Sequence, residues 1–335
     1  MKKQTRREFL GNTIFAAAGA GLGLAALPGG SLLASAQKGG RGYTAARHVI
    51  LLNGVMAGFP ESVEGGNATS GVVENRAPGR GPQKHIAGVK YEDITVNFGT
   101  GMSRAFYDWI RATLERRSAR MNGAISTCDF NWNEVERMEW SNGLITEVGF
   151  PALDAASKDA AKMTVKISPE AIRMVKGAGS LRGAAAQAVH KKWLPSNFRL
   201  NIDGLDCTRV NRIEAITVKQ KVVDNPVGEL RSPQRPSGQM AVSSLVVTLP
   251  ESHAAAFIKW HEAVAIKGNN GPNQRKNGQL DYLTPDLRES LFALRFKGLS
   301  IHKLNSERVG AHNENIRGVR AEMSFEGLQF SYNAA

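Results

Sequence analysis

The feature that most constrains the fold of this chain is an internal repeat. Short motifs of the first half recur in the second half, in the same order and at nearly constant spacing. The matched segments are Leu52-Asn53-Gly54-Val55 with Ile202-Asp203-Gly204-Leu205, Ala105-Phe106-x-x-Trp109 with Ala256-Phe257-x-x-Trp260, Gly143-Leu144 with Gly298-Leu299, and Met163–Ile167 with Ala321–Phe325. The period is far longer than the roughly 20 to 50 residues of solenoid and propeller repeats. The sequence therefore predicts one domain that is present twice.

Both halves show the alternation of apolar and polar residues that is typical of strands with one buried face. The alternating apolar residues are Ile94, Val96 and Phe98; Met163, Val165 and Ile167; Leu294 and Phe296; and Val319, Ala321, Met323 and Phe325. The continuous apolar run Leu245–Leu249 favours a strand that is covered on both faces. We therefore expect a mainly β fold.

One amphipathic helix is predicted in each half. The apolar residues at helical spacing are Phe106, Trp109, Ile110 and Leu114 in the first half and Phe257, Trp260 and Val264 in the second. Ser103 and Ser252 stand where a helix N-cap is expected. An aromatic pair at this spacing could form a platform for a cofactor or a sugar, but packing against a sheet is commoner. We predict that both helices pack on the sheets.

The repeat divides the chain into domains at 37–176 and 197–335, joined by a linker at 177–196 that is rich in Gly and Ala. Within this linker, Leu181–Trp193 could form a helix.

Each domain also contains a long segment rich in turn-forming residues. Glu64–Gly88 is rich in glycine, and Asp224–Gly238 contains three prolines. Both precede the strand that leads into the helix. Long loops of this kind either contact partners or lack a fixed structure, and the sequence leaves both alternatives open.

Residues 1–36 have the pattern of an export signal that is removed from the folded domains. A basic start precedes the apolar run Ile14–Leu27, which is too short and too weakly apolar to span a membrane comfortably. The residues that resemble a twin-arginine signal are Arg6, Arg7, Phe9 and Leu10, and those of the signal peptidase site are Ala34 and Ala36. Because the twin-arginine route carries folded cargo, we expect folding in the cytoplasm and export to the periplasm or beyond, with no stable membrane span after cleavage.

The chain is basic, with a net charge of +13 that falls to about +10 once the signal is removed. Such a charge could attract nucleic acid, anionic lipid or an acidic polymer. The densest basic cluster, Arg116-Arg117 with Arg120, is short, however, and acidic residues are interleaved elsewhere. A solvated surface that keeps the protein soluble is the alternative interpretation.

Cys128 and Cys207 have neither Cys-x-x-Cys spacing nor a nearby His pattern. An oxidising compartment would allow a disulfide between them. We predict two separately buried thiols.

Motifs for catalysis or cofactor binding are weak throughout. The glycine-rich Gly19–Gly23 lies inside the apolar run of the signal, and neither Gly-x-Ser-x-Gly nor His-Glu-x-x-His occurs. His253 and His261 are about two helical turns apart, which is too far to grip one metal ion. The remaining candidates for an acid–base set are Glu147, Asp154 and Asp159. Solvated loop charges are the simpler interpretation, and we predict no catalytic, cofactor or metal site.

The first half resembles the tail tube proteins of contractile phages and related injection machines. The segments that carry the resemblance are Val72–Arg76, Gly88–Val96, Phe106–Trp109, Phe150-Pro151 and Leu153–Asp159, and in the second half Phe198–Gly204. Beyond Gly204 the second half matches only in pattern.

The resemblance implies two copies of a β-barrel or β-sandwich domain, each with one flanking helix (a mainly β, α+β fold). Six such domains close a ring in that family, so two domains in one chain imply a homotrimer, or a larger ring, with pseudo-sixfold symmetry. Other tail-like components would then be partners, and no small-molecule substrate is implied. The segments Glu64–Gly88 and Asp224–Gly238 would reach the adjacent ring or neighbour.

Two features depart from that family. Tail tube subunits normally carry no export signal, and the fusion of two unequal copies suggests a specialised ring or adaptor. The sequence therefore predicts a non-enzymatic structural protein that assembles outside the cytoplasm. The alternatives are an exported basic module that binds an acidic polymer and an exported cofactor enzyme.

Overall fold

A computed structural model describes residues 47–75, 81, 83–117, 119–181, 193–222, 237–306 and 317–333. The predicted export signal and its cleavage site lie outside these residues. So do most of the segment Leu181–Trp193 and most of the segment Asp224–Gly238.

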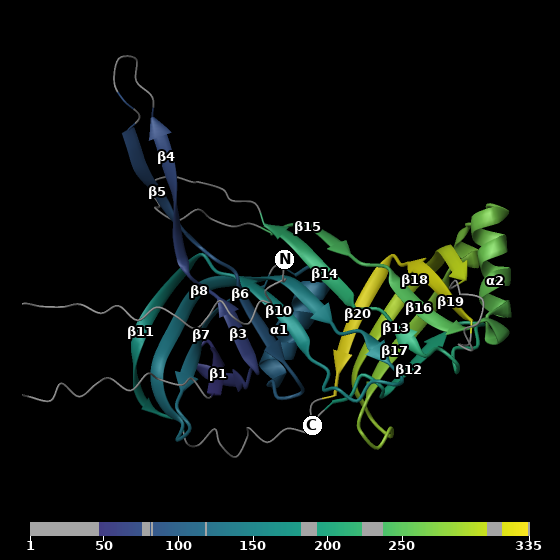
Figure 1. Ribbon diagram of the computed structural model, residues 1–335, viewed down its shortest axis with the longest axis horizontal. Coiled ribbons are helices and arrows are strands. Elements are labelled where there is room, and N and C mark those ends of the chain that lie inside the picture. The colour runs from purple at the N-terminus through teal and green to yellow at the C-terminus, as the bar shows by residue number, and fades with distance from the viewer. Residues whose placement is uncertain are drawn as a thin grey trace, which may run out of the picture. The chain divides into compact units, whose positions relative to one another are not determined.

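Strands dominate both halves of the chain (Figure 1). The elements of the first half are β1 (Arg47–Leu52), β2 (Val55–Gly58), β3 (Ser62–Gly65), β4 (Ala68–Asn75), β5 (Gln83–Tyr91), β6 (Ile94–Phe98), α1 (Arg104–Leu114), β7 (Arg120–Cys128), β8 (Asn133–Phe150), β9 (Leu153–Asp154), β10 (Met163–Ser168) and β11 (Ala171–Ser180). Those of the second half are β12 (Phe198–Ile202), β13 (Arg212–Ile213), β14 (Ile216–Val222), β15 (Ser237–Val242), β16 (Leu245–Pro250), α2 (Ala255–His261), β17 (Lys276–Leu283), β18 (Ser290–Ser306), β19 (Gly318–Ser324) and β20 (Gly327–Tyr332). The predicted fold class, mainly β with flanking helices, is confirmed.

The strands of the two halves pair in the same order. The first sheet runs β2-β1-β7-β8-β10-β6-β3, with β11 also on β8, and the second runs β12-β17-β18-β19-β16-β13, with β20 also on β18. In these two orders each strand of the first half except the short β2 has a counterpart in the second half. The pair β14–β15 also belongs to the first sheet, and β9 extends the second sheet beside β13. The long strands β8 and β18 are the centres of these patterns, because each pairs with several neighbours along its length.

The predicted alternation is confirmed where the strands form the core. Ile94, Val96 and Phe98 are fully buried in β6, and they pair with the buried residues of β10. The run Leu245–Leu249 is buried at every position, as expected for a strand covered on both faces. Apolar burial of this kind is the main contribution to stability in a β fold.

The two helices bury the predicted faces. Phe106, Trp109, Ile110 and Leu114 are buried in α1, and Phe257 and Trp260 are buried in α2. Ser103 is the N-cap of α1, although its hydroxyl makes no capping hydrogen bond. The prediction of Ser252 as an N-cap is wrong. A 3₁₀ turn over Glu251–His253 follows the strand, and α2 begins only after Ala254.

Two predicted matches between the halves shift. Met163–Ile167 corresponds to Val319–Met323, two residues before the predicted Ala321–Phe325, as their pairing with β8 and β18 shows. The match of Gly143 with Gly298 shifts by one residue. Gly143 pairs with Met121, whereas the residue in the corresponding place on β18 is Leu299, which pairs with Lys276. The residue before each is left-handed, with φ of 48° at Asn142 and 66° at Gly298. A left-handed backbone favours either Gly or Asn. The two positions therefore share a backbone conformation although their residue types differ, and a comparison of residue types alone misaligned them.

The structure also differs from the predicted end of the first domain and from one predicted loop. Gly177 and Gly179 belong to β11, so the strand runs beyond the predicted domain end at residue 176. The segment Glu64–Gly88 is mostly not a loop, because its described residues form much of the hairpin β4–β5. Its glycines and prolines predicted a loop, but the segment contains two strands that pair over seven residue positions.

The described residues fall in a single compact unit, in which the two halves share one hydrophobic core. Tyr107 of α1 stacks on Tyr332 of β20 with ring centroids 5.1 Å apart, and it also contacts Phe292. The Tyr332 hydroxyl donates a hydrogen bond to Asp108 at 2.8 Å. The first helix thus rests on the sheet of the second half.

Candidate assembly surfaces

The sheets of the two halves are joined by backbone pairing at one place that bears on assembly. Strand β14 of the second half runs antiparallel to the end of β8 in the first half, and β15 continues this sheet on the far side of β14. The paired residues are Ile216 with Phe150, Thr217 with Gly149, Val218 with Val148 and Lys219 with Glu147. The hairpin β14–β15 therefore covers an edge of β8 that would otherwise expose unpaired backbone groups.

Side chains stabilise this junction on both faces. Ile216 and Val218 are buried in the common core, with 1% and 3% of their surface exposed. On the other face the Glu147 carboxylate lies 3.0 Å from the Lys166 ammonium and 3.7 Å from that of Lys219. Glu147 thus links three adjacent strands, β10, β8 and β14, by charge.

The counterpart hairpin in the first half has no such partner among the described strands. Strands β4 and β5 form a separate two-stranded sheet, and no other described strand pairs with them. Figure 1 shows this hairpin standing apart from the two larger sheets. A two-stranded sheet is at best marginally stable alone in water, so this hairpin is suited to pairing with a further strand.

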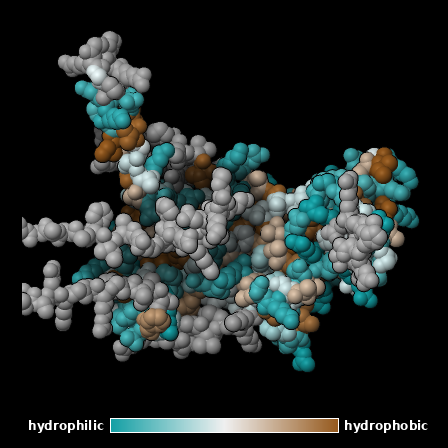
Figure 2. Space-filling view, viewed as in Figure 1, coloured by the Kyte–Doolittle hydropathy of each residue, from teal (hydrophilic) through white to brown (hydrophobic). Residues whose placement is uncertain are grey.

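The hairpin β4–β5 also exposes apolar side chains. Val72 and Ile86 face each other across the hairpin and are 65% and 80% exposed, and Val73 is half exposed. Figure 2 shows hydrophobic colour on this hairpin. Exposed large apolar residues that gather on one element are typical of an interaction surface.

An open strand edge lies in the second half. Strand β18 pairs with β17 and β20 over its first part and with β19 over residues 300–306. Along that last part no described strand pairs with its other edge, the edge that β14 covers on β8. Lys303 and Asn305 are exposed there, and Leu304 is only partly buried.

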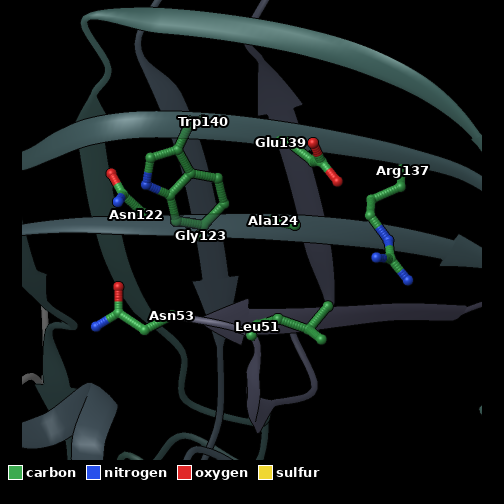
Figure 3. Close-up of a pocket in the computed structure, with 9 residues that line it drawn as sticks. Leu51, Asn53, Asn122, Gly123, Ala124, Arg137, Glu139 and Trp140 are labelled. Atoms are coloured by element: carbon green, nitrogen blue, oxygen red, sulfur yellow. The ribbon is translucent and has the colours of Figure 1, made fainter.

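A hollow also lies on the first sheet, and its charged side chains are engaged within the protein. It has a volume of about 490 Å³ and lies beside Trp140, Arg137 and Glu139 of β8 (Figure 3). The charged side chains are already paired, since Arg137 binds Glu134 at 2.6 Å and Glu139 binds Arg173 at 2.6 Å. The Trp140 indole N–H donates to a backbone carbonyl. The charged and indole groups of the hollow are therefore engaged within the protein, and Asn53 and Asn122 are the other polar residues that line it.

The structure separates the predicted acid–base candidates. Glu147 is engaged by lysines, as described above. Asp154 lies in the short strand β9 rather than in a loop, where it pairs with Arg212 of β13. Asp159 is exposed. Among the described residues no hydrogen bond or ion pair joins any two of the three, and their roles are structural or solvated.

The predicted thiols and histidines can be placed. Cys128 and Cys207 are both free and buried, which confirms the prediction of two separate thiols. Burial raises the pKa of both, that of Cys207 to about 11, so neither is an activated nucleophile. His253 is exposed on the turn before α2, and His261 ends that helix. The described residues contain no cluster of metal-ligating side chains.

The basic cluster is interrupted by acidic partners. Arg117 pairs with Glu115, and Arg120 pairs with Glu170 at 2.8 Å. The described part of the chain also has no helix long and apolar enough to cross a bilayer.

Comparison with known proteins gives one family match. Residues 47–173 match the model of the T4-like virus tail tube protein gp19. No curated protein matches the chain. The matched stretch begins with β1 and ends within β11, so it covers the first sheet and the hairpin β4–β5.

Solved structures of injection systems are similar over a comparable length. A chain of the PVC sheath-tube complex, an extracellular contractile injection system, is 20% identical, with a TM-score of 0.36 over 40% of this chain and 91% of that chain. A chain of the tube terminating cap of the anti-feeding prophage is 18% identical, with a TM-score of 0.38 over 44% and 99%. Hcp1 from Flavobacterium johnsoniae is 15% identical, with a TM-score of 0.27 over 41% and 95%.

Proposed function

Because residues 47–173 match the model of the T4-like virus tail tube protein gp19, we propose that this chain is a non-enzymatic structural subunit whose copies assemble into rings. The ring would serve as a tube, ring or adaptor component of an injection-type machine outside the cytoplasm. The observation that carries the proposal is the unequal use of strand edges. One hairpin covers an edge inside the chain, while its counterpart and the counterpart edge have no described partner.

The proposal treats the second half as another copy of the tail tube domain. Its support is the common pairing order of the two sheets and the helix that lies at the same place in each. Two such domains in one chain make three chains the number that supplies six domains. A homotrimer with pseudo-sixfold symmetry is therefore the assembly we expect.

Edge chemistry gives the physical reason for a ring. A strand edge exposes backbone N–H and C=O groups that are best paired with another strand. The contact between a hairpin of one copy and an edge of the next is heterologous, and such contacts leave no open edge only when they close a ring.

The route of export is part of this proposal. Arg6 and Arg7 would direct the folded chain through the twin-arginine pathway, with cleavage after Ala36. Replacing both arginines by lysine should leave the chain in the cytoplasm with its first 36 residues attached. Release of a shortened chain to the periplasm by that variant would contradict this route.

A mass measurement on the chain purified after export tests the assembly. Native mass spectrometry or light scattering should give three chains or a larger closed ring. A single chain at high concentration would contradict the proposal.

A basic module that binds an acidic polymer is the second candidate, and only the net charge of +13 favours it. It predicts retention on heparin that falls steeply with salt. The pairing of Arg117 and Arg120 with acidic residues weakens it. A cofactor enzyme has no supporting observation among the described residues, and visible absorbance of the purified chain would revive it.

A further inference from the structure

We propose that the start of the hairpin β4–β5 in one chain pairs with the outer edge of β18 in a second copy of the same chain. This inference rests on the proposed function and names the surface through which the copies would join. We take a second copy of the chain as the partner because β14–β15 makes the corresponding contact with β8 inside one molecule.

The two hairpins start with the same register. Ala68 pairs with Tyr91 where β4 meets β5, and Val218 pairs with Val242 where β14 meets β15. The next pairs also correspond, Thr69 with Lys90 and Lys219 with Ala241. Ala68 is therefore the counterpart of Val218, the residue at the centre of the junction with β8.

The two edges also correspond residue by residue. Val148 of β8 pairs with Val165, and Leu304 of β18 pairs with Ala321. Val165 and Ala321 pair in turn with the central valines of the next strands, Val96 and Val247. Leu304 is therefore the counterpart of Val148.

These two correspondences fix the register between chains. The expected pairs are Asn67 with Asn305, Ala68 with Leu304 and Thr69 with Lys303. The pairing is antiparallel, as it is at the junction of β14 with β8. Because side chains alternate between the two faces of a strand, a shift of one residue would reverse every side chain of the hairpin.

The exposure of the two surfaces agrees with this assignment. Ala68, Thr69, Lys303 and Asn305 are all exposed in the single chain. By contrast, Val218 and Val148 are buried where the equivalent contact is made. Pairing would cover Leu304 and would bring the apolar residues Val72 and Ile86 of the hairpin towards the second molecule. One hairpin and one open edge per chain give a head-to-tail contact that can repeat until a ring closes.

A cysteine pair introduced into the full chain tests the register. Residues directly opposite each other on antiparallel strands bring their Cβ atoms close enough for a disulfide. In the double variant Ala68→Cys with Leu304→Cys, we expect mild oxidation to link most chains to one another and a reducing agent to release them. The matched control is Thr69→Cys with Leu304→Cys, in which the two thiols point to opposite faces and should remain mostly unlinked.

The outcomes separate this inference from the proposed function. Rings that form by native mass but show no linkage, or the same linkage in the control, would overturn the register and leave the ring standing. A monomer at high concentration would overturn both. Should the first double variant fold poorly, Asn67→Cys with Asn305→Cys tests the neighbouring pair of exposed residues in the same way.

Discussion

The hairpins β4–β5 and β14–β15 begin with the same register, yet only the second has a sheet to join. Strand β14 pairs with β8 and buries Ile216 and Val218. Among the described strands β4 pairs only with β5, and Val72 and Ile86 of this hairpin are exposed. The two hairpins therefore differ in the strand edge beside them: β14 lies next to an edge of β8, whereas no described strand outside the hairpin pairs with β4. One of the two corresponding contacts is made inside the chain, and in the proposed assembly the other is made with a second molecule.

The largest difference between the hairpins is expected in the free energy of unfolding when an aspartate replaces Val218 or its counterpart Ala68. Val218→Asp buries an unpaired carboxylate in the core and should destabilise the chain by about 3 kcal/mol. Ala68→Asp changes an exposed residue and should alter the stability of the dissociated chain by less than about 0.5 kcal/mol. Urea unfolding at low protein concentration measures both, and equal losses would contradict the distinction between the hairpins.

Ala68→Asp should instead weaken association. The charge would lie against Leu304 of the neighbouring molecule in the proposed contact, so the ring should dissociate at a higher protein concentration than that of the unaltered chain. Light scattering over a dilution series gives this comparison. An unchanged dilution profile would count against Ala68 as part of the contact.

A smaller difference is expected at the charges of the two edges. Glu147 is mostly buried between Lys166 and Lys219, and its replacement by Gln should cost about 1 kcal/mol. Its counterpart on the open edge is Lys303, which is half exposed and pairs with Glu322. Lys303→Gln should cost less than about 0.5 kcal/mol in the dissociated chain. The midpoints of urea unfolding for the two variants provide the test.

The open edge should also contribute to acid sensitivity through Glu322. Hydrogen bonding to Lys303 and then to Arg320 holds the pKa of the Glu322 carboxyl below its ordinary value of 4.5, although burial opposes this. A lowered folded pKa means that the stabilisation is complete above pH 4.5 and is lost as the pH falls through the folded pKa.

Glu322→Gln should therefore reduce the fall in unfolding free energy below pH 4.5, whereas Glu64→Gln, at an exposed residue, serves as the control. Urea unfolding at several pH values measures the slope. Identical slopes for the unaltered chain and Glu322→Gln would show that this carboxylate has no such role.

The smallest effect is expected at the native thiols. Cys128 and Cys207 are buried, and burial raises the pKa of both. A thiol reagent should label neither in the folded chain and both after denaturation. Rapid labelling in the native state would contradict their burial and would also require their replacement before the cysteine-pair experiment.

How far the sequence predicts this molecule depends on what each segment buries. The strands with one buried face, such as Ile94–Phe98, alternate clearly between apolar and polar residues, and they were predicted. The hairpin β4–β5 buries little in a single chain, so it lacks that alternation, and its glycines and prolines indicated a loop. The clue within it was the apolar pair Val72-Val73 opposite Ile86.

The candidate contact surfaces were the least accessible to sequence reasoning. Pairing of β14 with β8 depends on the register between segments far apart in the chain, which neither composition nor periodicity encodes. The shift at Asn142 and Gly298 shows the same limit, because the matching property is a left-handed backbone and not a residue type. The repeat itself suggested where to look for the second hairpin.

Amide hydrogen exchange tests the central claim most directly, because it reports backbone pairing at each edge. Residues Ile216–Lys219 of β14 should be protected at every protein concentration, since their partner lies in the same chain. In Asn67–Thr69 and Lys303–Ser306, the amides that do not already pair with β5 or β19 should exchange quickly in the dissociated chain and become protected together as rings form. Fast exchange at both segments in fully assembled rings would contradict the account.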